Sequence, residues 1–268
     1  MIEFRSRGAL YGECWYEETA PAGCAVDVLA LRQRAAPVSG ARARPFLTLI
    51  NDLDCDEDAL LARFGGNCRD KVKRAQRRDG LELVISNEPR ERLAEFRAYY
   101  DAFAAQRGLR PANAEWLLGA CAAGQLVLAS AVLRGDVLAW HAYVATPGTA
   151  WLQHTVAKFR DVAAEQRQLV ARANRWLHWR SMAWFRERGL ERYDWGGLFE
   201  REDSAEQAGI NRFKREFGGR EVRAYDCYVP VTFKGRLRLG LNRLGDGLRA
   251  VSARVPRPRR REGAAAPA

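Results

Sequence analysis

The side chains best suited to proton transfer lie where the sequence pattern indicates strands. Asp194 lies near the end of the run LERYDW (190–195) and precedes Gly196 and Gly197. A carboxylate at a strand end that faces a cleft can orient an amine or remove its proton. It can equally cap a turn in which the glycines adopt positive φ. The sequence leaves both interpretations open.

Two histidines occupy consecutive apolar runs, His141 in VLAWHAYVAT (137–146) and His154 in TAWLQHTV (149–156). If these strands pair, the two imidazoles can approach each other or a substrate, and imidazole changes charge near neutral pH. A strand histidine is also often a satisfied structural residue. We predict a catalytic role for His154 and a substrate contact for His141. His178 lies in a tryptophan-rich helix, where the pattern predicts packing.

Other chemistries lack a signature in this chain. The six cysteines are scattered, no CxxC occurs, and no Cys/His cluster has zinc spacing. Reduced thiols and no bound metal are therefore expected. No Ser-His-Asp or nucleophilic-cysteine arrangement is readable, so we expect direct transfer without a covalent enzyme intermediate.

In the second half of the chain, segments whose apolar residues have the spacing of a strand alternate with segments that have the spacing of a helix. Arg134-Gly135-Asp136 and Pro147-Gly148 separate its central strands as tight turns. Strands are predicted at 81–86, 125–133, 137–146, 149–156, 190–195 and 221–229, and helices at 90–107, 111–122, 166–188 and 206–217. This order, β-α-α-β-β-β-α-β-α-β, predicts a mixed α/β sheet that contains an antiparallel meander.

The first part of the chain is less regular. Short apolar patches are broken by Gly, Pro and Arg, and PFLTLI (45–50) is the best strand candidate. Acidic residues at 54–58 precede ALLARF and read as the first turn of a helix. Residues 67–79 predict a basic helix that ends at Gly80.

Two motifs carry a family resemblance. The segment 172–197 ends in YDWGG and is followed by GINRFKREFGG (209–219). The pair is similar to the C-terminal GNAT-like domain of the Fem-type aminoacyltransferases and related acetyltransferase-like proteins. The resemblance covers residues 67–229 and includes the Arg/Lys-rich helix before the first strand. Residues 1–66 are too short for a full first GNAT-like domain.

The resemblance implies that the chain is an N-acyltransferase. Phe213 and Lys214 match the Phe-Lys pair at the Fem reaction centre, where the lysine stabilises the developing oxyanion. An ammonium is a compact charge that acts strongly in a dry site. The pattern alone would instead make Lys214 an exposed helix residue among charged neighbours.

The acyl donor is open between two classes. GNAT proteins that bind acetyl-CoA hold its pyrophosphate with a glycine-containing loop before the long helix. The corresponding stretch here, RQLVAR (167–172), lacks both glycines. We place donor contacts at Arg160, Arg167, Arg172 and Asn174. Acyl-CoA is the first candidate donor, and aminoacyl-tRNA, which also suits a basic surface, is the alternative.

The acceptor implied by the resemblance is a nucleotide-linked or lipid-linked glycan precursor of the cell envelope. We place its contacts at Arg69 and Lys73 on the basic helix, and at Tyr193 and His141. A solvated helix face is the competing interpretation of the basic residues.

The C-terminal segment has its own pattern. Leu237, Leu241, Leu244, Leu248, Val251 and Val255 recur at spacings of three and four with arginines between them. This pattern predicts an amphipathic helix on an anionic membrane surface, over residues 231–255. A helix packed on the body is the alternative. The end of the chain, with VPRPRRREGAAAPA, predicts a disordered tail.

Charge is unevenly distributed over the 268 residues. The formal net charge is +11, of which +4 lies in 67–80 and +8 in 231–268, so the remaining residues are nearly neutral. The hydrophobic fraction of 47% excludes wholesale disorder. Because the N-terminus lacks an apolar signal core and no apolar run reaches the length of a membrane span, we expect a cytoplasmic protein, peripheral on the inner membrane face.

Together these features predict an α/β (α+β) fold with a GNAT-like, mostly antiparallel sheet. Residues 1–66 form a truncated N-terminal lobe, 67–230 the acyltransferase domain, and 231–268 the basic helix and tail. The expected reaction is acyl transfer to an amine of a cell-envelope glycan precursor. The alternatives are an aminoacyl-tRNA-dependent Fem-like enzyme and a non-catalytic GNAT-like module that binds nucleic acid or an anionic surface.

Overall fold

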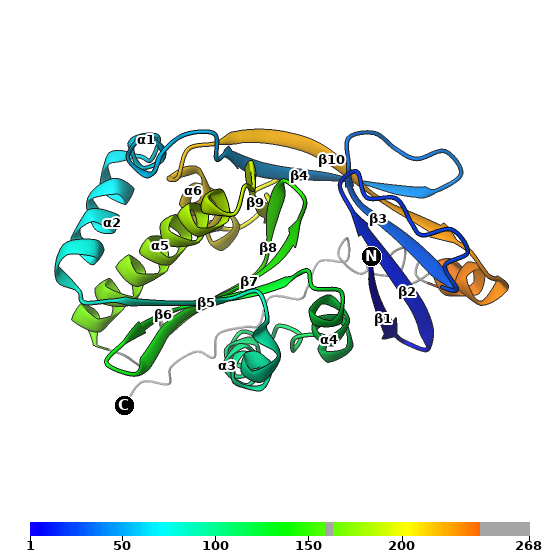
Figure 1. Ribbon diagram of the computed structural model, residues 1–268, viewed down its shortest axis with the longest axis horizontal. Helices are drawn as coiled ribbons and strands as arrows, with labels where there is room; N and C mark the ends of the chain where they lie inside the picture. The colour runs from blue at the N-terminus through cyan, green and yellow to red at the C-terminus, as the bar shows by residue number, and fades with distance from the viewer. Residues whose placement is uncertain (159–162, 242–268) are drawn as a thin grey trace, which may run out of the picture.

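The described residues, 1–158 and 163–241 of the computed structural model, form one ten-stranded sheet between helices (Figure 1). The strand order is β1-β2-β3-β10-β4-β9-β8-β7-β6-β5. Only the pairs β2–β3 and β8–β9 are parallel among these strands. The predicted fold class, a mixed and mostly antiparallel sheet flanked by helices, is confirmed.

The elements follow the chain in this order. The strands are β1 (Ile2–Ser6), β2 (Ala9–Trp15), β3 (Val28–Arg34), β4 (Arg42–Asp52), β5 (Glu82–Ser86), β6 (Leu126–Leu133), β7 (Asp136–Thr146), β8 (Thr149–Ala157), β9 (Arg192–Gly197) and β10 (Arg220–Pro230). The helices are α1 (Glu57–Ala62), α2 (Gly66–Arg78), the 3₁₀ helix η1 (Pro89–Arg92), α3 (Leu93–Gln106), α4 (Ala114–Ala122), α5 (Ala164–Glu187) and α6 (Ala205–Arg215).

The central meander β6–β7–β8 is closed by the turns that the sequence predicts. Arg134 and Gly135 both have positive φ between β6 and β7, as a type I′ hairpin turn requires. Gly148 follows Pro147 with φ +80° between β7 and β8. These turns fix the register that aligns His141 with Thr155 and Ala142 with His154.

Helices cover the two faces of this half of the sheet differently. In Figure 1, α2 and α5 lie on one side of β5–β8, and α3 and α4 lie on the other. The α2 residues Cys68, Val72 and Ala75 are buried toward α5 at helical spacing. The core on the other face gathers around Phe96, Trp116 and Trp140. The sheet is therefore buried on both faces where it carries the predicted site.

The sheet is continuous across the predicted boundary at residue 66. The strand expected at 45–50 is the middle of β4, which pairs with β10 on one side and with β9 on the other. Three earlier strands, β1 to β3, were not predicted, because arginine, glutamate and glycine interrupt their apolar residues. The division into an N-terminal lobe (1–66) and an acyltransferase domain (67–230) stays a prediction.

After β10 the chain is helical over residues 233–241. Leu239 is buried against Tyr11 and Val28, so this helix packs on the body. Phe233, Leu237 and Leu241, which are spaced by four residues, are 80%, 57% and 53% exposed. The predicted apolar positions from 244 to 255 lie outside the described residues. No helix among those described combines the length and apolarity that a membrane span needs.

Candidate active site

A cavity opens where β8 and β9 separate. Their parallel pairing ends at Trp151 and Asp194, although β8 continues for six more residues. Gly196 lies at this point with φ +66°, and a Cβ there would come within 2.9 Å of the Leu152 carbonyl oxygen. Glycine is therefore required where the strands diverge.

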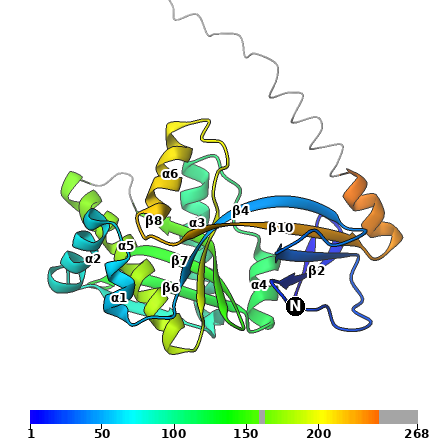
Figure 2. The ribbon, with the colours of Figure 1, turned by 90° about the horizontal axis from the view of Figure 1, so that it is seen from above.

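The opening between the strands holds a cavity of about 710 Å³, which we call the reaction cavity. Its walls come from β8, from α5, from α6 and the loop before it, and from the C-terminal end of α3. Figure 2 shows α6 beside α3, and an ion pair of 3.0 Å between Arg107 and Glu206 joins that end of α3 to α6. Apolar side chains dominate the lining, among them Leu152, Val156, Trp195, Phe199, Ile210 and Phe213. Electrostatic interactions are strong in such surroundings.

Lys214 is half-buried and lines this cavity from α6. Ser204 caps the helix by accepting a hydrogen bond from the Gln207 backbone, and Gly218 ends it with φ +72°. The Lys214 Nζ donates to the Gly197 carbonyl oxygen at 2.6 Å. Burial lowers the pKa of Lys214 to about 8, against the attraction of Asp194. The ammonium therefore predominates at neutral pH and has few water molecules to screen it.

Phe213 supports the same region by packing. Its ring centroid lies 5.7 Å from His178 and 6.3 Å from Trp195. The Arg175 guanidinium lies over the Phe213 ring at 4.8 Å and forms an ion pair with Glu216 at 2.7 Å. The predicted pair Phe213–Lys214 thus lies together in the cavity wall.

Asp194 is fully buried and is not among the residues that line the cavity. Its carboxylate accepts hydrogen bonds from the Gly196 N–H at 2.9 Å, from the Tyr16 hydroxyl at 3.0 Å and from the Thr48 hydroxyl. Burial raises its pKa to about 6, and these hydrogen bonds partly oppose the rise. This geometry matches the turn-capping interpretation, with an electrostatic effect on Lys214.

A closed chain of hydrogen bonds begins and ends at the cavity. Asn174 and His178 both line it, one turn apart on α5. His141 Nε2 lies 2.8 Å from Asn174 Oδ1, and His141 Nδ1 lies 2.8 Å from the Tyr143 hydroxyl. The Tyr143 and Tyr193 hydroxyls are 3.2 Å apart, and Tyr193 lies 2.7 Å from His178 Nδ1.

The amide oxygen at one end sets the direction of this chain. Because an oxygen only accepts, His141 Nε2–H donates to Asn174, and neutral His141 accepts from Tyr143. Tyr143 then accepts from Tyr193, which accepts from His178 Nδ1–H. Burial lowers the pKa of His141 to about 4 and that of His178 well below its usual value, so both rings are neutral. His178 Nε2 is thereby left with a lone pair.

His178 Nε2 has no hydrogen-bond partner among the described residues although the side chain is fully buried. The sequence interpretation missed this residue, because tryptophans around it predict packing. Its ring does pack, 3.9 Å from His141 and 4.4 Å from Trp195 by centroid. The local sequence pattern could not show the contact with Tyr193, because that residue lies 15 positions further along the chain.

His154, predicted as catalytic, lies elsewhere. Its ring packs 4.6 Å from Tyr100 and 6.2 Å from Phe96, on the face covered by α3. Burial lowers its pKa to about 4. His154 lines a separate, smaller hollow with Gln153 and Trp116.

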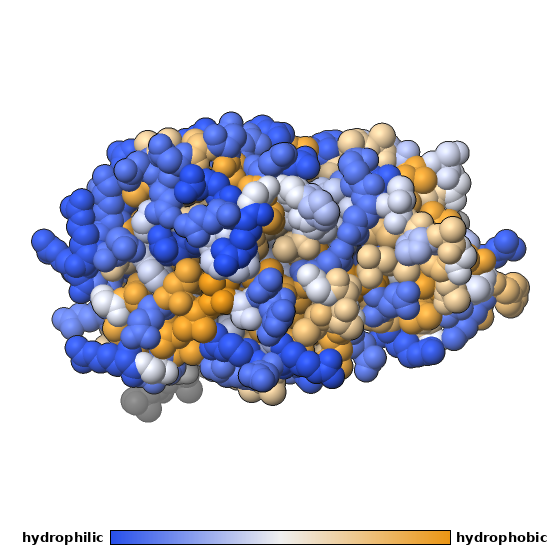
Figure 3. All heavy atoms as spheres, viewed as in Figure 1, coloured by the Kyte–Doolittle hydropathy of each residue, from blue (hydrophilic) through white to orange (hydrophobic). Residues whose placement is uncertain are grey.

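The predicted acceptor contacts are divided. Tyr193 and His141 are fully buried members of the hydrogen-bonded chain. Arg69 and Lys73 lie on α2 and are not among the residues that line the reaction cavity. Lys73 is exposed on α2. Figure 3 shows hydrophilic side chains along the left edge of the molecule, where α2 lies.

The predicted donor contacts also differ in their surroundings. Arg172 forms two hydrogen bonds with Asp79, at 2.6 and 3.0 Å, in a largely buried ion pair. Asn174 lines the cavity, whereas Arg160 lies outside the described residues. Arg167 lies in the first turn of α5, and its backbone N–H donates to Ala163 within the helix.

This arrangement bears on how coenzyme A fits. Residues 167–172 are helical, so their backbone N–H groups are used inside α5 and cannot cradle a pyrophosphate as a glycine loop does. The described residues therefore do not fit that mode of binding, and no reaction step below depends on it. Metal chemistry also finds no ligand set, since no group of three His, Cys, Asp or Glu side chains with ligand geometry occurs in the part of the chain that the structure describes.

Comparisons with known proteins agree with this architecture. A family model described as an acetyltransferase (GNAT) domain matches residues 62–215, more than half of the chain. No curated protein matches the sequence. Among solved structures, FemX is 15% identical with a TM-score of 0.56, and the match covers 67% of this chain and 61% of FemX. The C-terminal domain of a putative lysylphosphatidylglycerol synthetase from Agrobacterium fabrum is also 15% identical, with a TM-score of 0.49 and coverage of 79% and 71%.

The chain thus spans about three fifths of the FemX structure that it resembles. At this identity the likeness shows the fold. The predicted resemblance to GNAT proteins of the Fem type is confirmed at that level.

Proposed function

We propose that this chain, which belongs to the family of GNAT acetyltransferase domains, transfers an acyl or aminoacyl group to an amine in the reaction cavity. The observation that carries the proposal is the pairing of a cation and a base in one cavity with a mostly apolar lining. Lys214 supplies the ammonium, and His178 supplies an imidazole nitrogen without a partner among the described residues.

The reaction needs both groups. The amine attacks the acyl carbonyl carbon, a new C–N bond forms, and the carbonyl oxygen becomes negative. Lys214 stabilises that oxyanion, and preorganised donors of this kind contribute on the order of 3 kcal/mol to the barrier. The amine proton passes to His178 Nε2. The C–X bond to the donor then breaks, and the proton on His178 goes to the leaving sulfur or oxygen.

The hydrogen-bonded chain makes His178 a suitable acceptor for that proton. Its Nδ1–H is held by Tyr193, so the imidazole keeps the tautomer with a free Nε2. His141, Tyr143 and Asn174 act through this contact and are positioning residues. The low pKa of His178 keeps it neutral at pH 7.

The decisive experiment measures amide formation with separate donors, acetyl-CoA and aminoacyl-tRNA, and a panel of amino sugars and peptidoglycan-type peptides. We expect Lys214→Ala to lower kcat by about 10²–10³-fold with one of these donors. Lys214→Arg keeps a charge but changes its geometry, and it should restore only part of the rate.

Arg201→Ala is the matched control, since this exposed residue is not among those that line the reaction cavity. Turnover that survives Lys214→Ala within threefold would reject the role of the lysine. A wild-type protein inactive with every pair would favour the non-catalytic alternative.

The donor remains a choice between acyl-CoA and aminoacyl-tRNA. GNAT domains in general support the first, and the helical conformation of 167–172 supports a donor that is not held by a glycine loop. The two-donor assay separates them directly.

For the acceptor we propose an amine on a nucleotide-linked or lipid-linked glycan precursor of the cell envelope. Support comes from the Fem-type motifs YDWGG and FKREFGG and from the basic face of α2, with Arg69 and Lys73. A cytoplasmic site of action follows from this acceptor.

Association with the inner membrane face is part of the same proposal. Phe233, Leu237 and Leu241 form an exposed stripe opposite the buried Leu239, and Arg236 adds positive charge beside it. Insertion of such a stripe into anionic lipid is favourable. Phe233→Ser with Leu237→Ser should weaken binding to anionic liposomes at least tenfold, and unchanged binding would refute the surface.

A further inference from the structure

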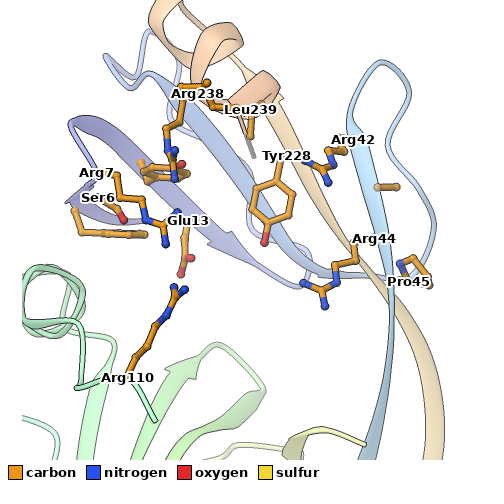
Figure 4. Close-up of a pocket in the computed structure, with 14 residues that line it drawn as sticks. Ser6, Arg7, Glu13, Arg42, Arg44, Pro45, Arg110, Tyr228, Arg238 and Leu239 are labelled. Carbon is orange, nitrogen blue, oxygen red and sulfur yellow. The ribbon is translucent and has the colours of Figure 1, made fainter. Parts of the chain in front are cut away.

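A second cavity lies at the other end of the sheet. It also measures about 710 Å³ and is enclosed by β1, β2, β4, β10, the loop between α3 and α4, and the helical residues 233–241. Figure 4 shows that the side chains lining it come from segments far apart in the sequence. We call it the arginine cavity, after Arg7, Arg44, Arg110 and Arg238.

Arg42 of β4 lines the cavity too, and the four arginines that name it come from four separate segments. Arg7 lies in the turn between β1 and β2, Arg44 on β4, Arg110 before α4, and Arg238 in the last described helix. In Figure 4 their side chains surround one hollow. None of the four forms an ion pair with a carboxylate among the residues that the structure describes.

Arginines elsewhere in the molecule have carboxylate partners. Arg172 pairs with Asp79 and Arg175 with Glu216, both within 2.7 Å. Four like charges that converge without an ion-pair partner repel one another. The arginine cavity is therefore electrostatically incomplete without an anion.

The cavity's own acidic group does not fill this role. Glu13 is the one carboxylate among the described residues that line the cavity. It accepts a hydrogen bond from the Trp116 Nε1–H at 2.8 Å, and burial raises its pKa. One carboxylate, already hydrogen-bonded, leaves most of the positive charge uncompensated.

We propose that the arginine cavity binds a ligand that carries two or more linked phosphate groups. A guanidinium matches two phosphate oxygens at once, and several of them around a concave surface reinforce each other's field. Three neutral hydroxyl-bearing residues, Ser6, Tyr11 and Tyr228, lie in the same lining. Tyr228 accepts a hydrogen bond from Arg32 at 2.7 Å, which leaves its own O–H to donate.

This site is separate from the reaction cavity, because none of its arginines lines that cavity. Its ligand class rests on and deepens the proposed function, since a nucleotide-linked or lipid-linked acceptor carries such phosphates. One loop joins the two places. Arg107 and Leu109 line the reaction cavity, and Arg110, the next residue, lines the arginine cavity. A ligand held by Arg110 therefore lies within one loop of the proposed chemistry.

Calorimetric titration with pyrophosphate tests the site without any assay of turnover. We expect saturable binding that is at least tenfold tighter than that of inorganic phosphate. The double variant Arg44→Ala, Arg110→Ala should weaken pyrophosphate binding at least tenfold. Both side chains are exposed and make no ion pair among the described residues, so the fold should survive.

A control variant removes the same charge elsewhere. Arg90 and Arg97 are exposed and do not line the cavity, so Arg90→Ala with Arg97→Ala should change affinity less than threefold. Equal weakening in both variants, or no saturable binding at millimolar pyrophosphate, would overturn the proposal. A third outcome would also overturn the proposal. In it, the wild-type protein binds an RNA hairpin but not pyrophosphate, and the Arg44, Arg110 variant no longer binds the hairpin.

Two further arms identify the source of the phosphates. A soluble nucleoside diphosphate and a polyprenyl diphosphate in neutral vesicles present the same linked phosphates. The compound that competes with pyrophosphate for the wild-type protein, and not for the double variant, supports the site and identifies the molecule that carries the linked phosphates. Failure of both to compete would contradict it.

Discussion

The two cavities of this protein have similar volumes, but they differ in whether their polar side chains have partners within the protein. In the reaction cavity, Lys214, Asn174 and His178 each make hydrogen bonds inside the protein, and His178 keeps one nitrogen unpartnered among the described residues. In the arginine cavity, Arg7, Arg44 and Arg110 are exposed and form no ion pair with a carboxylate among the described residues. The first arrangement fixes protonation states, whereas the second keeps charge available. The pairing of the polar side chains, rather than the cavity volume, therefore distinguishes a cavity suited to catalysis from one suited to ligand binding.

The largest effect should come from the one nitrogen that the reaction cavity leaves free. We expect His178→Gln to lower kcat by about 10²–10³-fold, because the amine proton loses its acceptor. The change in acceptor KM should be under threefold, since the reacting amine is bound by other groups. The measurement is steady-state kinetics, with thermal unfolding as a check on folding.

His141→Asn sharpens this prediction. His141 acts on His178 through Tyr143 and Tyr193 and also packs directly on its ring, so its loss should cost about tenfold in kcat and shift the acidic limb of the pH profile. Wild-type kcat in both variants would assign the hydrogen-bonded chain to packing.

Loss of an ion-paired arginine and loss of an unpaired one should change the stability of the protein by different amounts. Arg172→Ala leaves the largely buried Asp79 without its ion pair, so the free energy of unfolding should fall by about 2 kcal/mol. Arg44→Ala should change it by less than about 0.5 kcal/mol. Urea unfolding measures both. Similar losses in the two variants would show that the arginine cavity is held together by contacts rather than poised to bind.

The smallest effect concerns pH. Lys214 must be protonated to stabilise an oxyanion, so kcat should fall as the pH rises past about 8, where burial places its pKa. Asp194→Asn removes an attraction that raises this pKa, and the alkaline limb should move to lower pH. Glu206→Gln, at the cavity wall but not among the groups that shift Lys214, is the control. Activity that rises above pH 8 would make neutral Lys214 a base.

Sequence patterns predicted elements whose signals are local. The meander, α5 and α6 follow from apolar periodicity, from Gly135 and Gly148 in turns, and from glycines after α6. β1 to β3 could not be predicted, because their burial depends on the pairing of β3 with β10, far along the chain, and on the C-terminal helix.

The candidate site divides in the same way. Lys214 and Phe213 were accessible through a short motif. His178 and the arginine cavity were not, because contacts such as His178–Tyr193, and the gathering of Arg7, Arg44 and Arg110 around one hollow, are made by the tertiary fold. The positive charge of the whole chain gave no indication of where unpaired guanidinium groups converge.

The loop between α3 and α4 connects the reaction cavity with the arginine cavity. Its neighbouring residues Leu109 and Arg110 line different cavities, so a shift of this loop on binding one ligand would alter the surroundings of the other. By thermodynamic linkage the influence is mutual, and each ligand changes the affinity of the other by the same factor. Phosphate anchoring at one end of the sheet would then set how readily substrate occupies the other.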